Sequence, residues 1–185
     1  MQDPRSDILA ALYRNDAAEA ARLAEAPGAL TIWEAAALGR DAAVAQRADE
    51  DPVCIDAAAP DGHTPLGLAA FFGHASTVRL LLARGADPGR ASNNTMTVQP
   101  LHAAVAGRNA DCVQAILDAG ADPNARQQVG YTPLMGAASA GREDLAGLLL
   151  ARGADRSLRS EDGKTAASVA AEHGHASLAN HLSAT

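Results

Sequence analysis

Apolar residues along this chain recur at helical spacing in short blocks, and turn-forming residues separate the blocks. The clearest block spans residues 61–87. Leu66 and Leu68 begin one short apolar segment, and Val78 and Leu81 give the next segment an apolar face with the period of a helix. The pattern predicts two short helices that are joined by a tight turn.

Turn residues mark the ends of these two helices. Thr64 can cap the first helix, and Pro65 stands at the first helical position, where its missing N–H costs nothing. Gly73 lies where the chain must turn between the helices, and Gly85 suits a left-handed C-terminal stop. The block therefore carries start and stop signals as well as apolar faces.

The same block recurs at a nearly constant interval. The interval is 34 residues from Thr31 to Pro65, 35 from Pro65 to Pro100, 33 from Pro100 to Pro133 and again 33 from Pro133 to Ala166. Such a period indicates one supersecondary unit that is stacked on copies of itself. A stack of this kind offers a binding surface rather than a conventional active site.

Several motifs identify the type of repeat. They are Thr64-Pro65-Leu66, Pro100-Leu101-His102-Ala103-Ala104, Thr132-Pro133-Leu134 and the Gly-Ala-Asp closings at 85–87, 120–122 and 153–155. These segments resemble ankyrin repeats over nearly the whole chain. The resemblance implies an all-α repeat solenoid of stacked helix-turn-helix units with projecting β-hairpin loops.

The resemblance also implies a single domain over residues 1–185. We expect an N-terminal helical cap at 6–27, repeats at 28–60, 61–95, 96–128 and 129–161, and a C-terminal capping repeat at 162–185. Pro27 is the predicted stop of the cap. Trp33 and His102 occupy the same position in their repeats, and both are expected to be structural, with His102 bonding to loop backbone.

Two departures from the repeat pattern stand out. Arg108 occupies the inter-helix position that glycine fills at Gly73, Gly141 and Gly174. The interval from Asp87 to Pro100 is 13 residues, against 11 at the equivalent places in the next two repeats. The hairpin in that interval therefore carries two extra residues, and extended loops tend to carry function.

Composition narrows the class of partner. The formal net charge of −7 argues against nucleic acid and anionic membranes as partners. Cys54 and Cys112 give no disulfide framework, and the chain shows no signal pattern or membrane-spanning apolar run. We therefore expect a cytoplasmic protein. Lys164 is the only lysine among 15 basic residues, which suggests a GC-rich, bacterial genome.

The family resemblance also predicts the binding surface. Ankyrin proteins typically bind through the hairpin tips and the exposed face of the first helix. Six of the matching residues would form an apolar and aromatic centre surrounded by acidic and polar groups, a composition typical of binding hot spots: Phe71, Phe72, Met96, Val98, Val129 and Tyr131. They include the only two phenylalanines of the chain. We predict a partner-binding set of Leu38, His63, Phe71, Phe72, Met96, Val98, Val129 and Tyr131. The alternative is that one or both phenylalanines turn inward and pack between repeats.

The predicted function is a non-catalytic protein-interaction module, which acts as an adaptor, scaffold or regulator without a cofactor. A monomer is expected, and homodimerisation through the phenylalanines is the alternative. An alternative hypothesis is that the chain is an inhibitor or immunity-type protein that blocks its partner protein. A metal-dependent enzyme using His173, His175 and Glu172 is the competing class, although Gly174 and His175 match the turn at Gly73 and His74.

Overall fold

The computed structural model describes residues 6–26, 28 and 30–183 of the chain. Pro27, the predicted stop of the cap, and residues 184–185 of the predicted capping repeat lie outside these ranges. The described part contains no β-strand. Its α-helices are α1 (Ser6–Tyr13), α2 (Ala17–Ala24), α3 (Ile32–Ala37), α4 (Asp41–Glu50), α5 (Pro65–Phe71), α6 (Ala75–Ala83), α7 (Pro100–Ala106), α8 (Ala110–Asp118), α9 (Pro133–Ser139), α10 (Glu143–Ala151), α11 (Ala166–Glu172) and α12 (Ala176–Ser183), with 3₁₀ turns η1 (Pro52–Asp56) and η2 (Gln128–Gly130).

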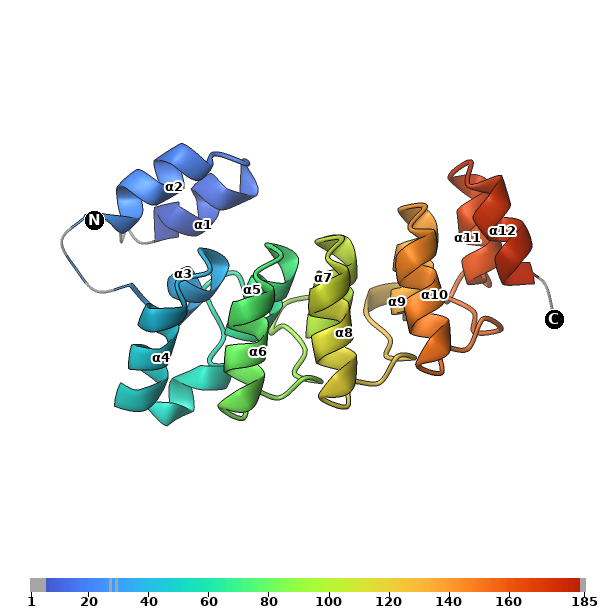
Figure 1. Cartoon of the computed structure of the whole chain (residues 1–185). Helices are drawn as coiled ribbons and strands as arrows, with labels where there is room; N and C mark the ends of the chain where they lie inside the picture. Colours follow the sequence, from blue (N-terminus) through green and yellow to red (C-terminus); the bar gives the residue numbers. More distant parts are fainter. Residues whose placement is uncertain (1–5, 27, 29, 184–185) are drawn as a thin grey trace.

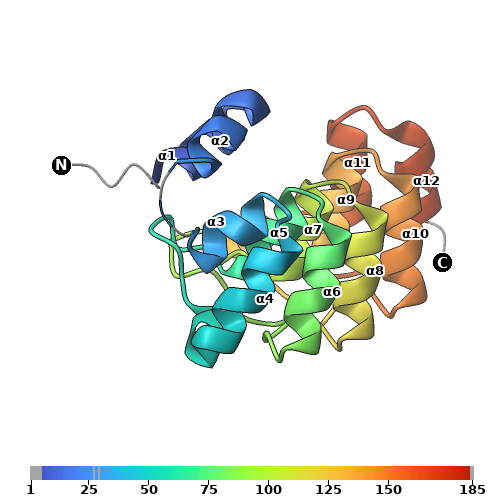
Figure 2. The ribbon, with the colours of Figure 1, turned by 60° about the vertical axis from the view of Figure 1, so that its left-hand side comes forward.

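The helix pairs from α3/α4 to α11/α12 stand side by side in one row (Figure 1). The first helices of the pairs contact one another along one face of the row, which we call the first-helix face. The second helices lie along the opposite face (Figure 2). This arrangement confirms the predicted all-α repeat solenoid. Each predicted repeat contains one helix pair, and the boundaries between repeats stay a prediction.

Threonine determines where most first helices begin. The hydroxyl groups of Thr31, Thr64, Thr132 and Thr165 each accept a hydrogen bond from the backbone N–H three residues later. Gln99, which precedes α7, makes no such bond. Capping of this type stabilises a helix by about 1 kcal/mol, so short helices gain much from it.

Neighbouring repeats are joined at the turn between their two helices. The residue before α6, α8, α10 and α12 sends a side-chain N–H to a carbonyl oxygen of the preceding repeat, at or next to its turn. These bonds run from His74 to Ala37 (3.0 Å), Asn109 to Gly73 (3.1 Å), Arg142 to Arg108 (2.8 Å) and His175 to Ser139 (3.3 Å). We call this series the turn ladder, and it gives His74 and His175 a structural role.

The hairpins are tight turns in place of paired strands. In one of them the backbone N–H of Gln127 donates to the carbonyl of Tyr131, whereas Ser92 donates to Val98, six residues on. The predicted extra residues therefore lie at the tip of this longer hairpin. Its tip remains attached to its neighbours, because successive tips share a backbone hydrogen bond, from Asn93 to Gly62 (2.7 Å), Gln128 to Met96 (3.1 Å) and Glu161 to Val129 (2.9 Å).

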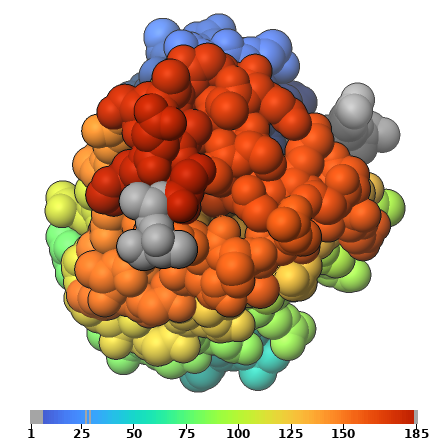
Figure 3. All heavy atoms as spheres, turned by 90° about the vertical axis from the view of Figure 1, so that its right-hand side faces the viewer, coloured from blue at the N-terminus to red at the C-terminus, as the bar shows by residue number. Residues whose placement is uncertain are grey.

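The N-terminal helices α1 and α2 lie over the turn ends of α3 and α5 (Figure 1). Leu9 packs in a buried cluster with Ala37 and Leu68, and Ile8 lies in a second cluster that includes Leu38. Viewed along the row from its C-terminal end, the blue atoms of this pair project beyond the edge of the stack (Figure 3). The pair therefore covers part of the turn edge beside the first-helix face.

Candidate binding groove

A groove of about 490 Å³ crosses the first-helix face along α5, α7 and α9. The helices line it with small side chains, including Gly67, Ala103 and Gly136. The adjacent hairpins add larger apolar side chains, of which Met96 and Tyr131 are the largest. A mostly apolar hollow with a few polar groups is the usual composition of a binding site.

Five of the eight predicted contact residues line this groove: His63, Phe71, Met96, Val98 and Tyr131. They come from three consecutive repeats, so no single repeat forms the surface. Met96 is 50% exposed and Phe71 is 39% exposed, which is unusual for large apolar side chains unless they contact a partner. The structure thus brings most of the predicted set into one place.

The other three predicted residues lie outside the groove. Leu38 is half-buried beneath α1 and α2. Phe72 is also half-buried and packs near Leu9 and Leu68, so the inward alternative applies to this phenylalanine. Val129 is 54% exposed, but it lines a separate hollow next to the groove. Sequence alignment alone gave no sign that the N-terminal helices would cover two of these positions.

An aromatic cluster forms the N-terminal end of the groove. The ring centroid of Tyr13 lies 6.0 Å from that of Phe71 and 5.5 Å from that of Phe72, and the two phenylalanines meet edge to face at 5.1 Å. The Tyr13 hydroxyl donates to Oδ2 of Asp61 at 2.8 Å. Burial, and then this bond, raise the pKa of Tyr13 above its ordinary value. Tyr13 therefore lines the groove. The sequence analysis predicted only that it belongs to the N-terminal helical cap.

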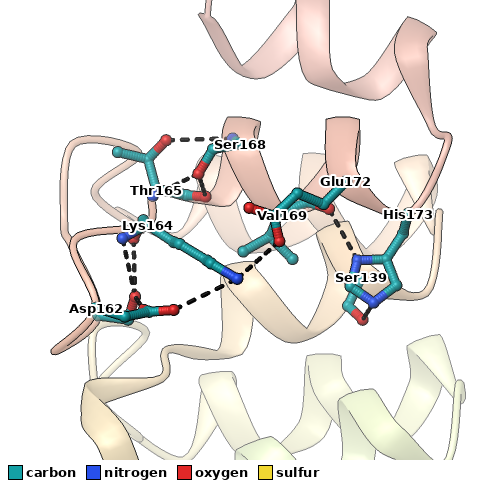
Figure 4. Close-up of polar contacts among 9 residues, drawn as sticks. Ser139, Asp162, Lys164, Thr165, Ser168, Val169, Glu172 and His173 are labelled. Atoms are coloured by element: carbon teal, nitrogen blue, oxygen red, sulfur yellow. Dashed lines mark hydrogen bonds and ion pairs between the residues drawn. The ribbon is translucent and has the colours of Figure 1, made fainter.

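Polar contacts hold the C-terminal end of the groove (Figure 4). The Ser139 hydroxyl, which belongs to a residue of the groove lining, lies 3.2 Å from Nε2 of His173. Nδ1 of His173 donates to the carbonyl of Val169 at 2.9 Å, which leaves Nε2 as the acceptor for Ser139. Burial raises the pKa of Tyr131. This chain of contacts holds the Ser139 hydroxyl at the C-terminal end of the groove.

A second hollow of about 400 Å³ adjoins this end and contains the only lysine of the chain. Nζ of Lys164 lies 2.8 Å from a carboxylate oxygen of Glu172 and 3.4 Å from one of Asp162 (Figure 4). The bond to Glu172 contributes most to raising the pKa of Lys164. Because one lysine faces two carboxylates, this hollow keeps a net negative charge.

His102 lies in the middle of the groove lining and is buried. Its Nε2 donates to the carbonyl of Tyr131 at 3.2 Å, and Nε1 of Trp33 likewise donates to the carbonyl of Ala57 at 3.1 Å. The structural roles predicted for both residues are confirmed. Burial is the main cause that lowers the pKa of His102.

The two histidines proposed for a metal enzyme bond within the fold. His173 contacts Val169 and Ser139 through its two ring nitrogens, and His175 belongs to the turn ladder. In the described ranges, no three His, Cys, Asp or Glu side chains gather where they could hold a metal ion. None of the helices described is both long enough and apolar enough to span a membrane.

Comparison with known proteins gives one family. The family profile described as "Ankyrin repeats (3 copies)" matches residues 32–127 and 101–184, which together cover most of the chain.

Relatives with known names match over shorter stretches. Ankyrin repeat and SAM domain-containing protein 6 of Mus musculus is 36% identical over 101 residues, which are 55% of this chain and 11% of that protein. Ankyrin repeat domain-containing protein 13B of Homo sapiens is 45% identical over 65 residues, or 35% of this chain and 10% of that protein. Tyrosine-protein kinase HTK16 of Hydra vulgaris is 38% identical over 87 residues, or 46% of this chain and 11% of the kinase.

The chain thus spans about a tenth of the length of these relatives. All three are animal proteins, so the bacterial origin inferred above rests on composition alone.

Proposed function

The chain belongs to the ankyrin repeat family, and from that premise we propose that it binds another protein through the groove on its first-helix face. Ankyrin repeats are generally protein-interaction modules and generally non-catalytic. The observation that carries the proposal is the gathering of Phe71, Met96, Val98 and Tyr131 from three repeats in one groove. Exposed aromatic and apolar anchors of this kind supply most of the energy at protein interfaces.

The groove suits an adaptor, scaffold or regulator, and an inhibitor that covers its partner's own site would use the same surface. No contact described above favours an enzyme built on His173 and His175. The free thiols of Cys54 and Cys112 are in keeping with the reducing cytoplasm, where we place the protein. We expect a monomer, and light scattering at increasing concentration tests the homodimer.

The test compares Phe71→Ala with the native chain in affinity purification from the source cell, followed by binding measurements on the recovered partner. Phe71 is exposed, so the variant should fold, and we expect a loss of roughly 1–3 kcal/mol in binding free energy. Phe72→Ala should also weaken binding, but Phe72 supports the N-terminal helices and is a less selective probe.

Val53→Ala is the matched control. Val53 is 82% exposed and lies on η1, outside the groove. Partner binding that is unchanged in Phe71→Ala, or reduced equally in both variants, would show that the groove is not the binding site.

A further inference from the structure

The inter-helix turn of the third repeat differs from the others. At this position Gly39, Gly73, Gly141 and Gly174 have φ angles between 64° and 81°, and Arg108 has a φ of 57°. Glycine adopts this left-handed conformation readily, whereas a residue with a Cβ does so at an energetic cost. The chain therefore tolerates strain at this turn to hold an arginine there, and strain that persists in a fold points to function.

The side chain of Arg108 lines the groove. It is exposed, and among the residues that the structure describes no hydrogen bond or ion pair involves its guanidinium group. Its printed hydrogen bonds in the described part of the chain come from the backbone: the N–H donates to the carbonyl of Val105, and the carbonyl accepts from Arg142 in the turn ladder. The turn itself therefore gives no reason for an arginine, because the carbonyl would be present with any residue.

Among the described residues that line the groove, Arg108 is also the only Asp, Glu, Lys or Arg. The nearby Arg142 is paired with Asp144, with a shortest contact of 2.6 Å. At the N-terminal end, the carboxylate of Asp61 accepts bonds from the Tyr13 hydroxyl and the His63 backbone. The charge within the described lining is therefore one positive guanidinium among mostly apolar residues, and the negative charge of Asp61 lies just outside this lining at the N-terminal end.

We propose that Arg108 receives a carboxylate of the bound partner. The occupant of the groove is a segment of another protein that carries an Asp or Glu side chain beside apolar or aromatic residues. Guanidinium and carboxylate form paired, parallel hydrogen bonds, and these strengthen when the surroundings exclude water. This inference rests on the proposed function and adds the chemistry of the partner to it.

The test uses short random peptides displayed on phage and selected on the full chain. Selected peptides are then synthesised and measured against the native protein, Arg108→Gly and Arg108→Glu. We expect them to share an acidic residue flanked by apolar ones, and to bind Arg108→Gly roughly ten-fold more weakly. Binding to the native chain should weaken as salt is raised, and binding to Arg108→Gly should depend less on salt.

Folding provides a separate readout. Glycine suits the left-handed turn, so Arg108→Gly should unfold at the same temperature as the native chain or about 1–3 °C higher. Arg40→Ala is the matched control, because it removes an arginine from the turn edge of another repeat, outside the groove. This control should leave peptide binding unchanged.

Two results would overturn the inference: selected peptides without an acidic preference, or equal binding to the native chain and Arg108→Gly. If Phe71→Ala weakens binding and Arg108→Gly does not, the proposed function holds and the role of Arg108 is wrong. If the selection yields no peptide whose binding depends on Phe71 or Arg108, both proposals fail.

Discussion

At the N-terminal end of the groove, the rings of Tyr13 and Phe71 belong to the lining and contact Phe72 beside it, whereas a chain of hydrogen bonds holds Ser139 at the other end. The aromatic end is packed against the buried side chains of Leu9 and Leu68. The polar end depends on surface hydrogen bonds and ion pairs, each of which contributes little to stability. Apolar packing therefore stabilises one end of the groove, and surface polar contacts stabilise the other. Substitutions at the two ends should change the stability of the fold by different amounts.

Leu68→Ala should produce the largest effect, at the aromatic end. Leu68 is 1% exposed and packs against Leu9 and Ala37, so its truncation removes buried apolar contact and leaves a cavity. We expect a loss of about 3 kcal/mol in the free energy of unfolding. Urea denaturation measures this, and a loss below about 1 kcal/mol would contradict the importance of packing at this end.

Ser139→Ala tests the polar end and should have a smaller effect. The variant loses the hydrogen bond to His173 but gains from the stronger helix preference of alanine within α9. The two contributions nearly offset each other, and we expect a loss of about 0.5 kcal/mol in the same urea experiment. A loss as large as that of Leu68→Ala would show that the two ends do not differ in the way described.

His102 lies between the two ends and should make stability depend on pH. Because burial lowers its pKa in the folded chain, the unfolded chain binds more protons between that lowered pKa and the ordinary value of about 6.5. Stability should therefore fall as pH drops below about 6.5. The stability of the His102→Gln variant should decrease less than that of the native chain over the same pH interval. Urea denaturation at several pH values measures the difference, and equal slopes would exclude His102 as the cause.

Lys164→Met should have the smallest effect on folding. The lysine and its partners Asp162 and Glu172 lie at the surface, where water and salt screen ion pairs. The midpoint of thermal unfolding should hardly change. A large decrease would mean that the polar end depends on this lysine more than surface ion pairs usually allow.

Much of the fold could be predicted from the sequence, because the same helix-start and turn residues recur from repeat to repeat. Thr64 and Pro65 mark a helix start, and their spacing to Pro100 and Pro133 predicts the stack. Half-buried Phe72 and exposed Phe71 are neighbours in one motif, and they differ because Phe72 packs against the buried cluster that contains Leu9 of α1. Alignment of repeats treats all repeats alike, so it cannot show which positions another part of the chain covers.

The same limit applies to the residues that sequence reasoning missed. Tyr13 reaches Asp61 across 48 residues of chain, and no spacing rule connects them. Arg108 was visible in the sequence as a departure from glycine, but its place in the groove depends on how α7 packs beside α5 and α9. Local signals predict the elements, and the assembled stack determines which side chains share a surface.

The turn ladder has a consequence for how such a chain can change its length. Its donors are an imidazole, an amide and a guanidinium, and each meets a carbonyl that every residue possesses. At the turn edge, a joint between repeats therefore requires only a side-chain N–H donor at one position, in addition to the helix packing and the bonds between hairpin tips. Duplication of a central repeat would supply both the donor and the acceptor at the new joint. The groove could therefore lengthen by whole repeats without a new type of contact.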